Sequence, residues 1–275
     1  MINHSFKQKV RISGRLEFKT AFHIGSGKEG ELSSNMGVLL EPDGRPILPG
    51  STLKGSFRTF AERLAEYLEL TACLMDKSLS QTVNCVSGLT DQAIRKDWYE
   101  QFKEIKKESQ KYEFLKNHVC DVCHLLGSPM HASRIFFSDG TLIHWSGGLQ
   151  VRDGVCIDRD TETAREGAKY DFEAVPCGAT FKITIDIENP EEHELALIGA
   201  VLAEWKNGFR LGGFSSRGLG KVSFTVTTIE QVDYTDRTQL KNFLLDNQMT
   251  SAKELLDNAL RKYLEKGGPH AEKND

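Results

Sequence analysis

The sequence predicts an α+β fold of the ferredoxin-like class, the scaffold that RNA-recognition modules share. The prediction depends on the order of elements along the chain, which is strand, helix, strand and then strand, helix, strand. Strands are indicated by alternation of apolar and polar residues, and helices by apolar residues at helical spacing. In this class an antiparallel sheet is backed by two helices. A fold of this kind does not define a function by itself.

Each predicted element has its own pattern. Residues 10–18 and 181–188 alternate most clearly, so we expect each of them to bury one face. A highly charged stretch at 95–116 has few periodic apolar residues and is expected to form an exposed helix within an insertion. The predicted strands are residues 10–18, 38–40, 133–138, 181–188 and 222–226, and the other predicted helices are residues 52–68, 191–206 and 251–264.

Length and composition limit the class of protein. The chain has 275 residues, of which 39% are hydrophobic and 27% are charged, and this suffices for one large domain with insertions. A formal net charge of -4 argues against a generally basic nucleic-acid-binding protein but is compatible with a local basic groove. No apolar run approaches the roughly 20 residues of a membrane helix, and residues 1–9 lack a signal-peptide core, so we expect a cytoplasmic protein without membrane contact.

Residues 48–58 form the motif around which the chain is organised, Leu-Pro-Gly-Ser-Thr-Leu-Lys-Gly-Ser-Phe-Arg. Ser51 or Thr52 is expected to cap a helix, and Lys54 and Arg58 lie four residues apart on one face of it. Unpaired N–H groups at a helix start, together with two cations, favour phosphate binding. The alternative is an ordinary strand-turn-helix junction whose cations face water, since the Walker spacing is absent.

The cysteines point to a metal. Cys120 and Cys123 form a Cys-x-x-Cys pair, and Cys73 and Cys85 lie at the other end of the charged insertion. Four thiolates suit a tetrahedral structural zinc site, which leaves no open position for catalysis. The alternative is a set of reduced cysteines without a ligand, because disulfides are rare in cytosolic proteins. Possible substitute ligands are His118 and His124.

Two further segments are rich in glycine or arginine. In the first, residues 212–221, the glycines allow close approach of a ligand to the backbone, and Arg210, Arg217 and Lys221 supply positive charge for phosphates. A tight hairpin before the last strand is the alternative. The second segment, residues 152–173, contains cations that can follow a sugar-phosphate backbone, and we interpret its neighbouring acids as salt-bridge partners rather than metal ligands. The cations are Arg152, Arg159, Arg165 and Lys169, and the acids are Asp153, Asp158 and Asp160.

Taken in order, these motifs resemble those of the RAMP superfamily of CRISPR systems, and within it the backbone subunits of type III effectors (the seven-family). Residues 48–58 are similar to the family's Ile-Pro-Gly-Ser-Ser-Leu-Lys-Gly-x-x-Arg motif. Four further segments match in order: Cys-x-x-Cys-x-Leu-x-Gly-Ser at 120–128, Ala-Ser-Arg and Phe-Ser-Asp within 132–139, Asp-Gly-Val-x-Ile-Asp-Arg at 153–159, and Gly-Gly-x-x-x-Arg-Gly-Leu-Gly at 212–220. The resemblance covers roughly residues 10 to 229.

The resemblance implies a ferredoxin-like palm that binds CRISPR RNA, with copies stacked along the guide. A thumb hairpin from each copy wedges into the duplex of guide and target RNA and flips out a base. Implied partners are CRISPR RNA, complementary target RNA, other copies or related RAMP subunits, and other type III effector subunits. The RNA-binding residues expected from motifs and resemblance together are His23, Ser51, Lys54, Arg58, Ser133, Arg134, Arg152, Arg159, Gly213, Arg217, Gly218 and Lys221.

The same resemblance suggests how the chain is divided. The expected palm, residues 1–235, is interrupted by a zinc-binding insertion and a thumb-like insertion. A C-terminal helix and a disordered polar tail follow it. The insertions are residues 73–123 and 145–175, the helix is 236–265 and the tail is 266–275.

Many members of this family also cut target RNA, using an aspartate and a divalent metal such as Mg²⁺. The expected aspartate falls on Asn35, and the nearest acids are Glu29 and Glu31. Because an amide cannot supply the carboxylate charge, we predict guide binding with weak or absent cleavage by this subunit. One alternative is a metal-dependent endoribonuclease that cuts guide-bound target RNA, and another is a stand-alone zinc-bound RNA-binding module.

Overall fold

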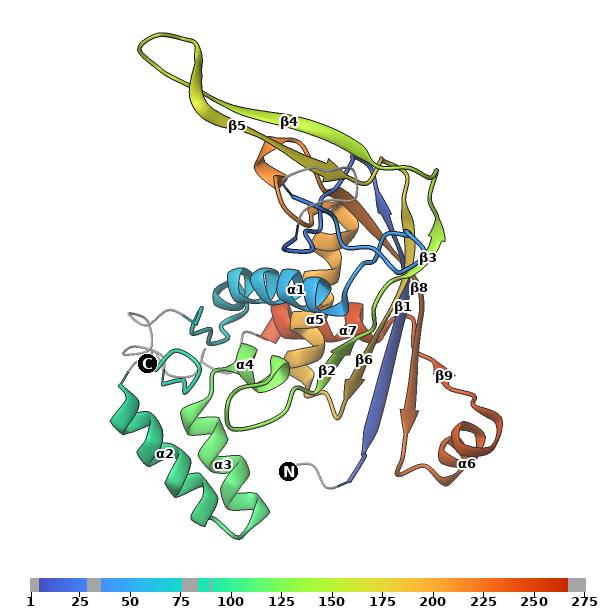
Figure 1. The fold of residues 1–275 in the computed structure, drawn as a ribbon. Helices are drawn as coiled ribbons and strands as arrows, with labels where there is room; N and C mark the ends of the chain where they lie inside the picture. The colour runs from blue at the N-terminus through green and yellow to red at the C-terminus, as the bar shows by residue number, and fades with distance from the viewer. Residues whose placement is uncertain (1–4, 29–35, 76–83, 90, 267–275) are drawn as a thin grey trace.

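The computed structural model describes residues 5–28, 36–75, 84–89 and 91–266, and Figure 1 shows their path. The strands are β1 (Gln8–Phe18), β2 (Ile135–Phe137), β3 (Thr141–His144), β4 (Gln150–Ile157), β5 (Ala164–Ala174), β6 (Thr180–Glu188), β7 (Phe209–Arg210), β8 (Lys221–Asp233) and β9 (Thr250–Ser251). The α-helices are α1 (Gly50–Ala65), α2 (Gln92–Glu104), α3 (Glu108–His118), α4 (Asp121–Leu126), α5 (Glu192–Asn207), α6 (Arg237–Asp246) and α7 (Leu255–Lys266), with short 3₁₀ helices at Glu66–Leu68 and Ser215–Arg217. No helix in the described ranges is long and apolar enough to cross a membrane.

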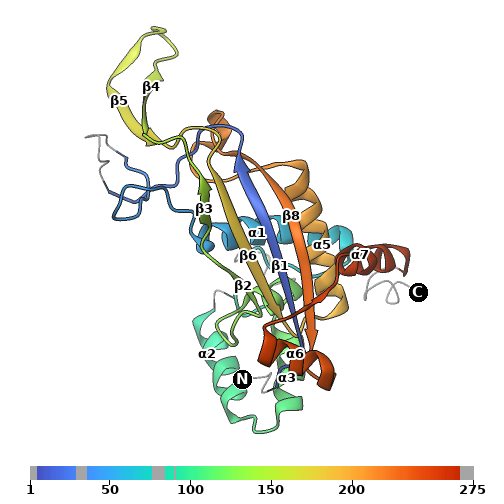
Figure 2. The same cartoon turned by 90° about the vertical axis from the view of Figure 1, so that its right-hand side faces the viewer.

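The main sheet is antiparallel and has the strand order β2-β6-β1-β8-β7, with β3 also pairing with β6 and β9 with β8. The helix α1 connects β1 to the β2 edge, and α5 connects β6 to β8. Figures 1 and 2 show both helices on the same face of the sheet. The prediction of a mixed fold with an antiparallel sheet backed by helices on one face is confirmed at this level.

Alternation in the strands creates the core between sheet and helices. In β1, Val10, Ile12 and Leu16 are fully buried, whereas Arg11, Ser13 and Arg15 on the other face stay at least partly exposed. From the helices, Phe57 of α1 and Trp205 of α5 meet with ring centroids 5.8 Å apart at 82°, an edge-to-face contact typical of aromatic cores. The two helices are therefore held against the sheet by a continuous apolar layer.

The start of α1 differs from the prediction. Neither Ser51 nor Thr52 is the cap, because the N-cap position is held by Pro49 and has no side-chain hydrogen bond. Instead the N–H of Gly50 donates to Oδ1 of Asp139, at 2.6 Å. A Cβ at Gly50 would lie 2.4 Å from the Phe137 carbonyl oxygen, so a glycine is required for this close approach. A carboxylate from a distant segment takes the place of the local cap.

Three other segments also differ from their predictions. Residues 38–40 form isolated bridges instead of a strand, in which Val38 pairs with Gly25 and Leu40 with Pro46. The charged insertion folds as two helices, α2 and α3, rather than one. Residues 236–265 contain α6 and α7 rather than one helix, because Asn247 takes a left-handed conformation (φ 53°) that ends α6. The predicted tail from 267 onward lies outside the described residues.

A second sheet consists of β4 and β5, which pair as an antiparallel hairpin. Figure 1 shows this hairpin projecting from the main sheet at the end opposite to α2 and α3. Most of β4 is exposed, including Val151, Val155 and Ile157. Its base is anchored, since Phe172 and Ala174 of β5 are buried in a small apolar cluster with Ala21 and Leu219.

Candidate functional site

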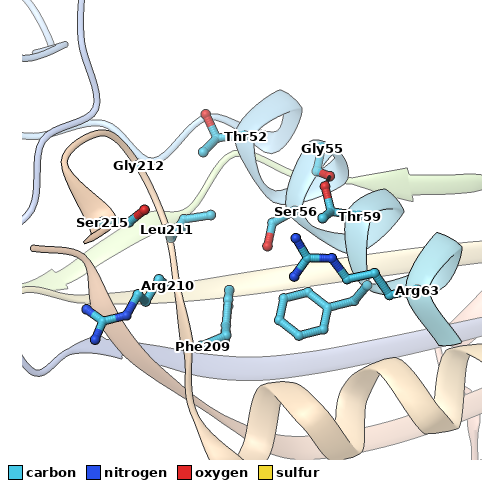
Figure 3. Close-up of a pocket in the computed structure, with 11 residues that line it drawn as sticks. Thr52, Gly55, Ser56, Thr59, Arg63, Phe209, Arg210, Leu211, Gly212 and Ser215 are labelled. Atoms are coloured by element: carbon cyan, nitrogen blue, oxygen red, sulfur yellow. Dashed lines mark hydrogen bonds between the residues drawn. The ribbon is translucent and has the colours of Figure 1, made fainter. Parts of the chain in front are cut away.

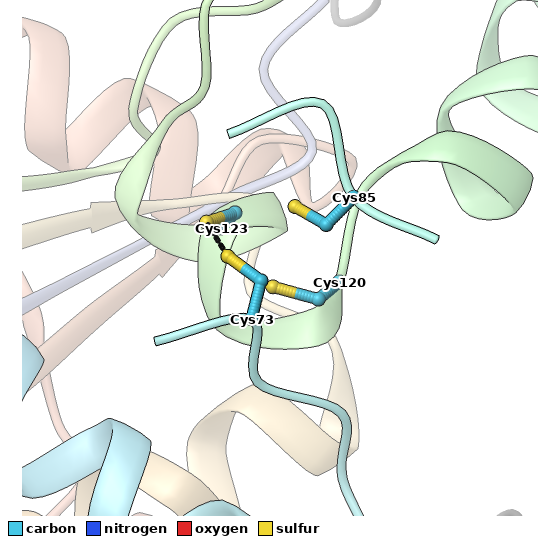
Figure 4. A group of neighbouring side chains, drawn as sticks. All are labelled: Cys73, Cys85, Cys120 and Cys123. Atoms are coloured by element: carbon cyan, nitrogen blue, oxygen red, sulfur yellow. Dashed lines mark hydrogen bonds between the residues drawn. The ribbon is translucent and has the colours of Figure 1, made fainter. Parts of the chain in front are cut away.

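Four cysteines come together beside α4, as Figure 4 shows. The structure brings Cys73, Cys85, Cys120 and Cys123 within 4.8 Å of one another, measured between sulfur atoms, and all four are buried. Cys120 is the N-cap residue of α4 and Cys123 lies within the helix. The predicted grouping of these four side chains is therefore confirmed, whereas neither predicted substitute, His118 or His124, belongs to the cluster.

Backbone contacts bring the two distant cysteines to α4. The N–H and hydroxyl of Thr71 both donate to Oδ2 of Asp121 at 2.7 Å, and this fixes the chain two residues before Cys73. The N–H of Val86 donates to the carbonyl oxygen of His118 at 2.9 Å, which fixes the residue after Cys85. Local hydrogen bonds on both sides thus determine where the thiols lie.

The geometry of the cluster fits a tetrahedral metal. A Zn–S distance of about 2.3 Å implies sulfur-to-sulfur edges of about 3.8 Å in a tetrahedron, and the sulfurs of Cys73 and Cys123 lie 3.7 Å apart. A hydrogen bond with Cys120 lowers the pKa of the Cys123 thiol to about 6, and the same contact raises the pKa of Cys120. Hydrogen bonds with neighbouring thiols also lower the pKa of Cys85, so two of the four buried thiols favour the charged form, and the four together are a donor set that a divalent cation can bind.

A groove runs along the exposed side of α1. Its walls are α1 on one side and β7 with the start of the glycine-rich segment on the other, and its volume is about 610 Å³. Figure 3 shows hydroxyl groups and two guanidinium groups, those of Arg63 and Arg210, lining it. The other lining residues are Thr52, Gly55, Ser56, Thr59, Phe60, Phe209, Leu211, Gly212 and Ser215. Hydroxyl groups, backbone and exposed arginines suit a phosphate-bearing chain.

The predicted site residues fall into two groups in the structure. In one group the side chain is hydrogen-bonded within the body of the protein, and the other group lies exposed or half-buried at the surface, where Arg217 also bonds to Tyr170. The first group is His23, Arg58, Ser133 and Arg134. The second group is Ser51, Lys54, Arg152, Arg159, Gly213, Arg217, Gly218 and Lys221. RNA contact stays a prediction for all of them, and Asn35 lies outside the described residues.

Arg134 is the clearest member of the internal group. It lies at the start of β2, is 9% exposed, and donates through Nη2 to Oε1 of the fully buried Glu194 on α5. Its Nη1 donates to the carbonyl oxygen of Asn189 at 2.8 Å, and its Nη2 lies 2.7 Å from Nδ1 of His124. These contacts connect β2, α4 and α5, so Arg134 acts as a structural link.

The glycine-rich segment packs on the base of the hairpin. Phe214 stacks on Phe172 of β5 with centroids 4.0 Å apart, and Arg217 donates from Nη1 to the hydroxyl of Tyr170. His23 lies beside them, with Nδ1 2.7 Å from the carbonyl oxygen of Glu173 and its ring 5.3 Å from Phe214. The glycine-rich segment therefore forms part of one wall of the groove and also packs against the base of the hairpin.

Sequence reasoning missed Arg63, and it noted Arg210 only as a source of charge. A signal was present, because Thr52, Ser56, Thr59 and Arg63 recur at spacings of three and four and so share one helix face. Lys54 faces a different environment, where burial and then the charge of Arg58 lower its pKa. The cation on the groove face of α1 is Arg63, nine residues after Lys54.

Comparison with known proteins places these features in context. The model of the RAMP superfamily matches residues 15–223. A protein of Methanocaldococcus jannaschii named CRISPR system Cms endoribonuclease Csm3 is 26% identical over 241 residues, covering 82% of each chain. A protein of the same name from Enterococcus italicus is 23% identical over 231 residues, covering 82% of this chain and 93% of the relative.

Proposed function

Because the chain belongs to the RAMP superfamily, we propose that it is a CRISPR RNA-binding backbone subunit of a type III RNA-guided effector complex. The observation that carries the proposal is the groove between α1 and the glycine-rich segment, which presents Arg63 and Arg210 from opposite walls. Both relatives have names that place them in a CRISPR system. The partners we propose are CRISPR RNA, complementary target RNA, other copies or related subunits, and other effector subunits, in the cytoplasm.

We assign the main sheet with α1 and α5 to a ferredoxin-like palm. The order β2-β6-β1-β8, all antiparallel, with one helix after β1 and one after β6, supports this assignment, because it is the split β-α-β arrangement of that class. The β4–β5 hairpin within residues 145–175 is our proposed thumb, and its exposed Val155 and Ile157 suit contact with bases. Residues 73–123 would then be the zinc-binding insertion.

In this proposal the guide backbone lies in the groove and continues over the glycine-rich segment. Arginine guanidinium groups bind phosphate oxygens through paired N–H donors, and hydroxyl groups add neutral hydrogen bonds. The exposed members of the predicted set would extend the contact, with Lys221 beside the glycine-rich segment and Arg152 and Arg159 on the hairpin. The net charge of -4 is then no obstacle, since the positive charge is local.

We further propose that the four cysteines bind a structural zinc ion. Cys73, Cys85, Cys120 and Cys123 would supply all four ligands, and zinc would supply a cross-link between the insertion and α4 with no open coordination position. The burial of all four cysteines, the proximity of their sulfurs within 4.8 Å and the 3.7 Å between those of Cys73 and Cys123 support this assignment.

The first test is purification of the protein followed by sequencing of any bound RNA. We expect RNA that carries one defined repeat sequence, because guide-binding subunits retain the guide. RNA of random sequence would favour the stand-alone RNA-binding module instead. The absence of RNA together with no affinity for added repeat RNA would contradict the proposal.

Replacing Arg63 and Arg210 with alanine should weaken binding of single-stranded RNA for every sequence tested. Each lost phosphate contact should also make the slope of log K against log salt shallower by about 0.7. The measurement is a binding isotherm at several salt concentrations. Lys96→Ala is the matched control, because Lys96 is an exposed cation on α2 that does not line the groove. An unchanged slope in the double variant would remove the groove from the RNA path.

A second candidate function is cleavage of guide-bound target RNA, favoured by the word endoribonuclease in the names of both relatives. If Asn35 stands where a catalytic aspartate is needed, Asn35→Asp should produce Mg²⁺-dependent cuts at regular intervals in a target where the parent shows few or none. The measurement is gel analysis of labelled target RNA with the assembled complex, and Asn35→Ala is the control. Regular cutting by the parent protein itself would instead support the enzyme.

A further inference from the structure

Arg58 reaches away from the groove and into the cysteine cluster. It lies on α1 with its side chain 15% exposed. Its Nη1 donates to Sγ of Cys123 at 3.4 Å, and its Nη2 donates to the carbonyl oxygen of Gly127 at 3.3 Å. Both terminal nitrogens of this guanidinium therefore hydrogen-bond to α4 or to Gly127, the residue that ends α4, and they hold the guanidinium beside the cysteine cluster.

The carboxylate of Glu62 holds this guanidinium in place. It lies 3.5 Å from Nη1 of Arg58, one helical turn further along α1. Burial raises the pKa of Glu62 while the charge of Arg58 opposes that shift, as expected for a half-buried pair. Arg58 is therefore fixed between a carboxylate of its own helix and a sulfur of another.

The charge of a zinc centre explains why a cation is needed here. Four thiolates and one Zn²⁺ carry a net charge of -2, and removing such charge from water is costly unless it is paired. Within the described ranges, Arg58 is the basic side chain that hydrogen-bonds to one of the four sulfurs. A hydrogen bond to a thiolate ligand also fixes its orientation and tunes the metal.

We infer that Arg58 is a positioning residue of the metal centre, which offsets the charge of the zinc-thiolate group and ties α1 to α4, and that it does not contact RNA. The inference rests on the proposed zinc site and revises the role predicted for Arg58 from the sequence. It implies that two arginines on one helix have separate roles, with Arg63 facing the groove and Arg58 facing the metal.

The test compares Arg58→Gln with Arg63→Gln in the full-length protein. Zinc affinity is measured by competition with a chromophoric chelator, and the thiolate-to-metal absorption band is recorded after loading with Co²⁺. We expect Arg58→Gln to weaken zinc binding roughly 10- to 100-fold and to shift the Co²⁺ band. Arg63→Gln should match the parent in both measurements. With zinc saturating, RNA affinity should fall in Arg63→Gln and stay at the parent value in Arg58→Gln.

Arg58→Lys keeps the test decisive if Arg58→Gln does not fold. It retains the charge but not the forked pair of donors, so its zinc affinity should lie between those of the parent and Arg58→Gln. Parent-like zinc affinity and an unshifted band in either Arg58 variant would overturn the inference. So would an equal loss of RNA affinity in the zinc-saturated Arg58 and Arg63 variants. A parent protein that binds neither Zn²⁺ nor Co²⁺ would refute the zinc proposal itself, and RNA binding measured on the same sample would show whether the RNA proposal survives.

Discussion

Cys120→Ser should abolish stoichiometric zinc binding and lower the free energy of unfolding by several kcal/mol, on the scale of structural zinc sites. The expected loss is large because the insertion has little apolar core of its own. Among the residues that the structure describes, α2 buries none and α3 buries only Leu115. The cross-link between residues 73, 85 and α4 must therefore supply much of what holds this region together.

Zinc content by elemental analysis and unfolding by denaturant measure the two parts of this prediction. Hydrogen exchange should show the loss of protection concentrated between residues 84 and 126, with β1 and β6 unaffected. Cys177→Ser is the matched control, since Cys177 is exposed and lies outside the cluster. Adding a strong chelator to the parent protein should reproduce the effect of Cys120→Ser. A zinc-free Cys120→Ser protein as stable as the parent would refute a structural role for the metal.

Local sequence predicted those elements whose pattern is determined by one buried face. In β1 and β6 every second residue packs on the core, so the alternation survives in the sequence without knowledge of the partners. The start of α1 could not be predicted in this way. Its cap comes from Asp139, which is 89 residues further along the chain, so no local propensity indicates it. The division of the C-terminal region into α6 and α7 likewise depends on a single residue, Asn247.

In the candidate site, too, some features could be predicted from the sequence and others could not. The four cysteines could be grouped because metal ligands have a recognisable spacing and a chemistry of their own. The binding partners of the arginines could not be predicted in this way. An arginine can bind a phosphate, a carboxylate or a thiolate, and its sequence context does not show which of them it binds. The sequence predicts RNA contact for both Arg58 and Arg134, yet their side chains hydrogen-bond to Cys123 and Glu194. Only the approach of α4 and α5 in the fold distinguishes them from Arg63.

Glu194→Ala should destabilise the protein by about 3–5 kcal/mol, the range expected when one member of a buried ion pair is removed. Glu194 is fully buried, and its Oε2 also accepts from the N–H of Glu191 at 2.8 Å in the capping box of α5. Without this carboxylate, the buried guanidinium of Arg134 loses the anion that it pairs with. Glu192→Ala is the control on the same helix, because Glu192 pairs with Lys262 at the surface, where such pairs contribute about 0–1 kcal/mol.

The ion pair of Glu194 and Arg134 should also make the stability of the folded protein decrease at acidic pH. Burial works to raise the pKa of Glu194, but a hydrogen bond with His124 and the charge of Arg134 outweigh it and lower the pKa below the ordinary value of 4.5. A carboxyl whose pKa is lower in the folded state stabilises the protein above its unfolded pKa, and this contribution is lost as pH falls through the folded value. Denaturant unfolding between pH 7 and pH 3 should therefore show a larger acid-dependent loss of stability in the parent than in Glu194→Gln, since other carboxylates such as Asp186 contribute equally to both. Two results would contradict this role for the Glu194 carboxylate as the charge that holds Arg134 in place. One is a loss of stability in Glu194→Ala no larger than in Glu192→Ala, and the other is a stability of Glu194→Gln that depends on acidic pH as strongly as that of the parent.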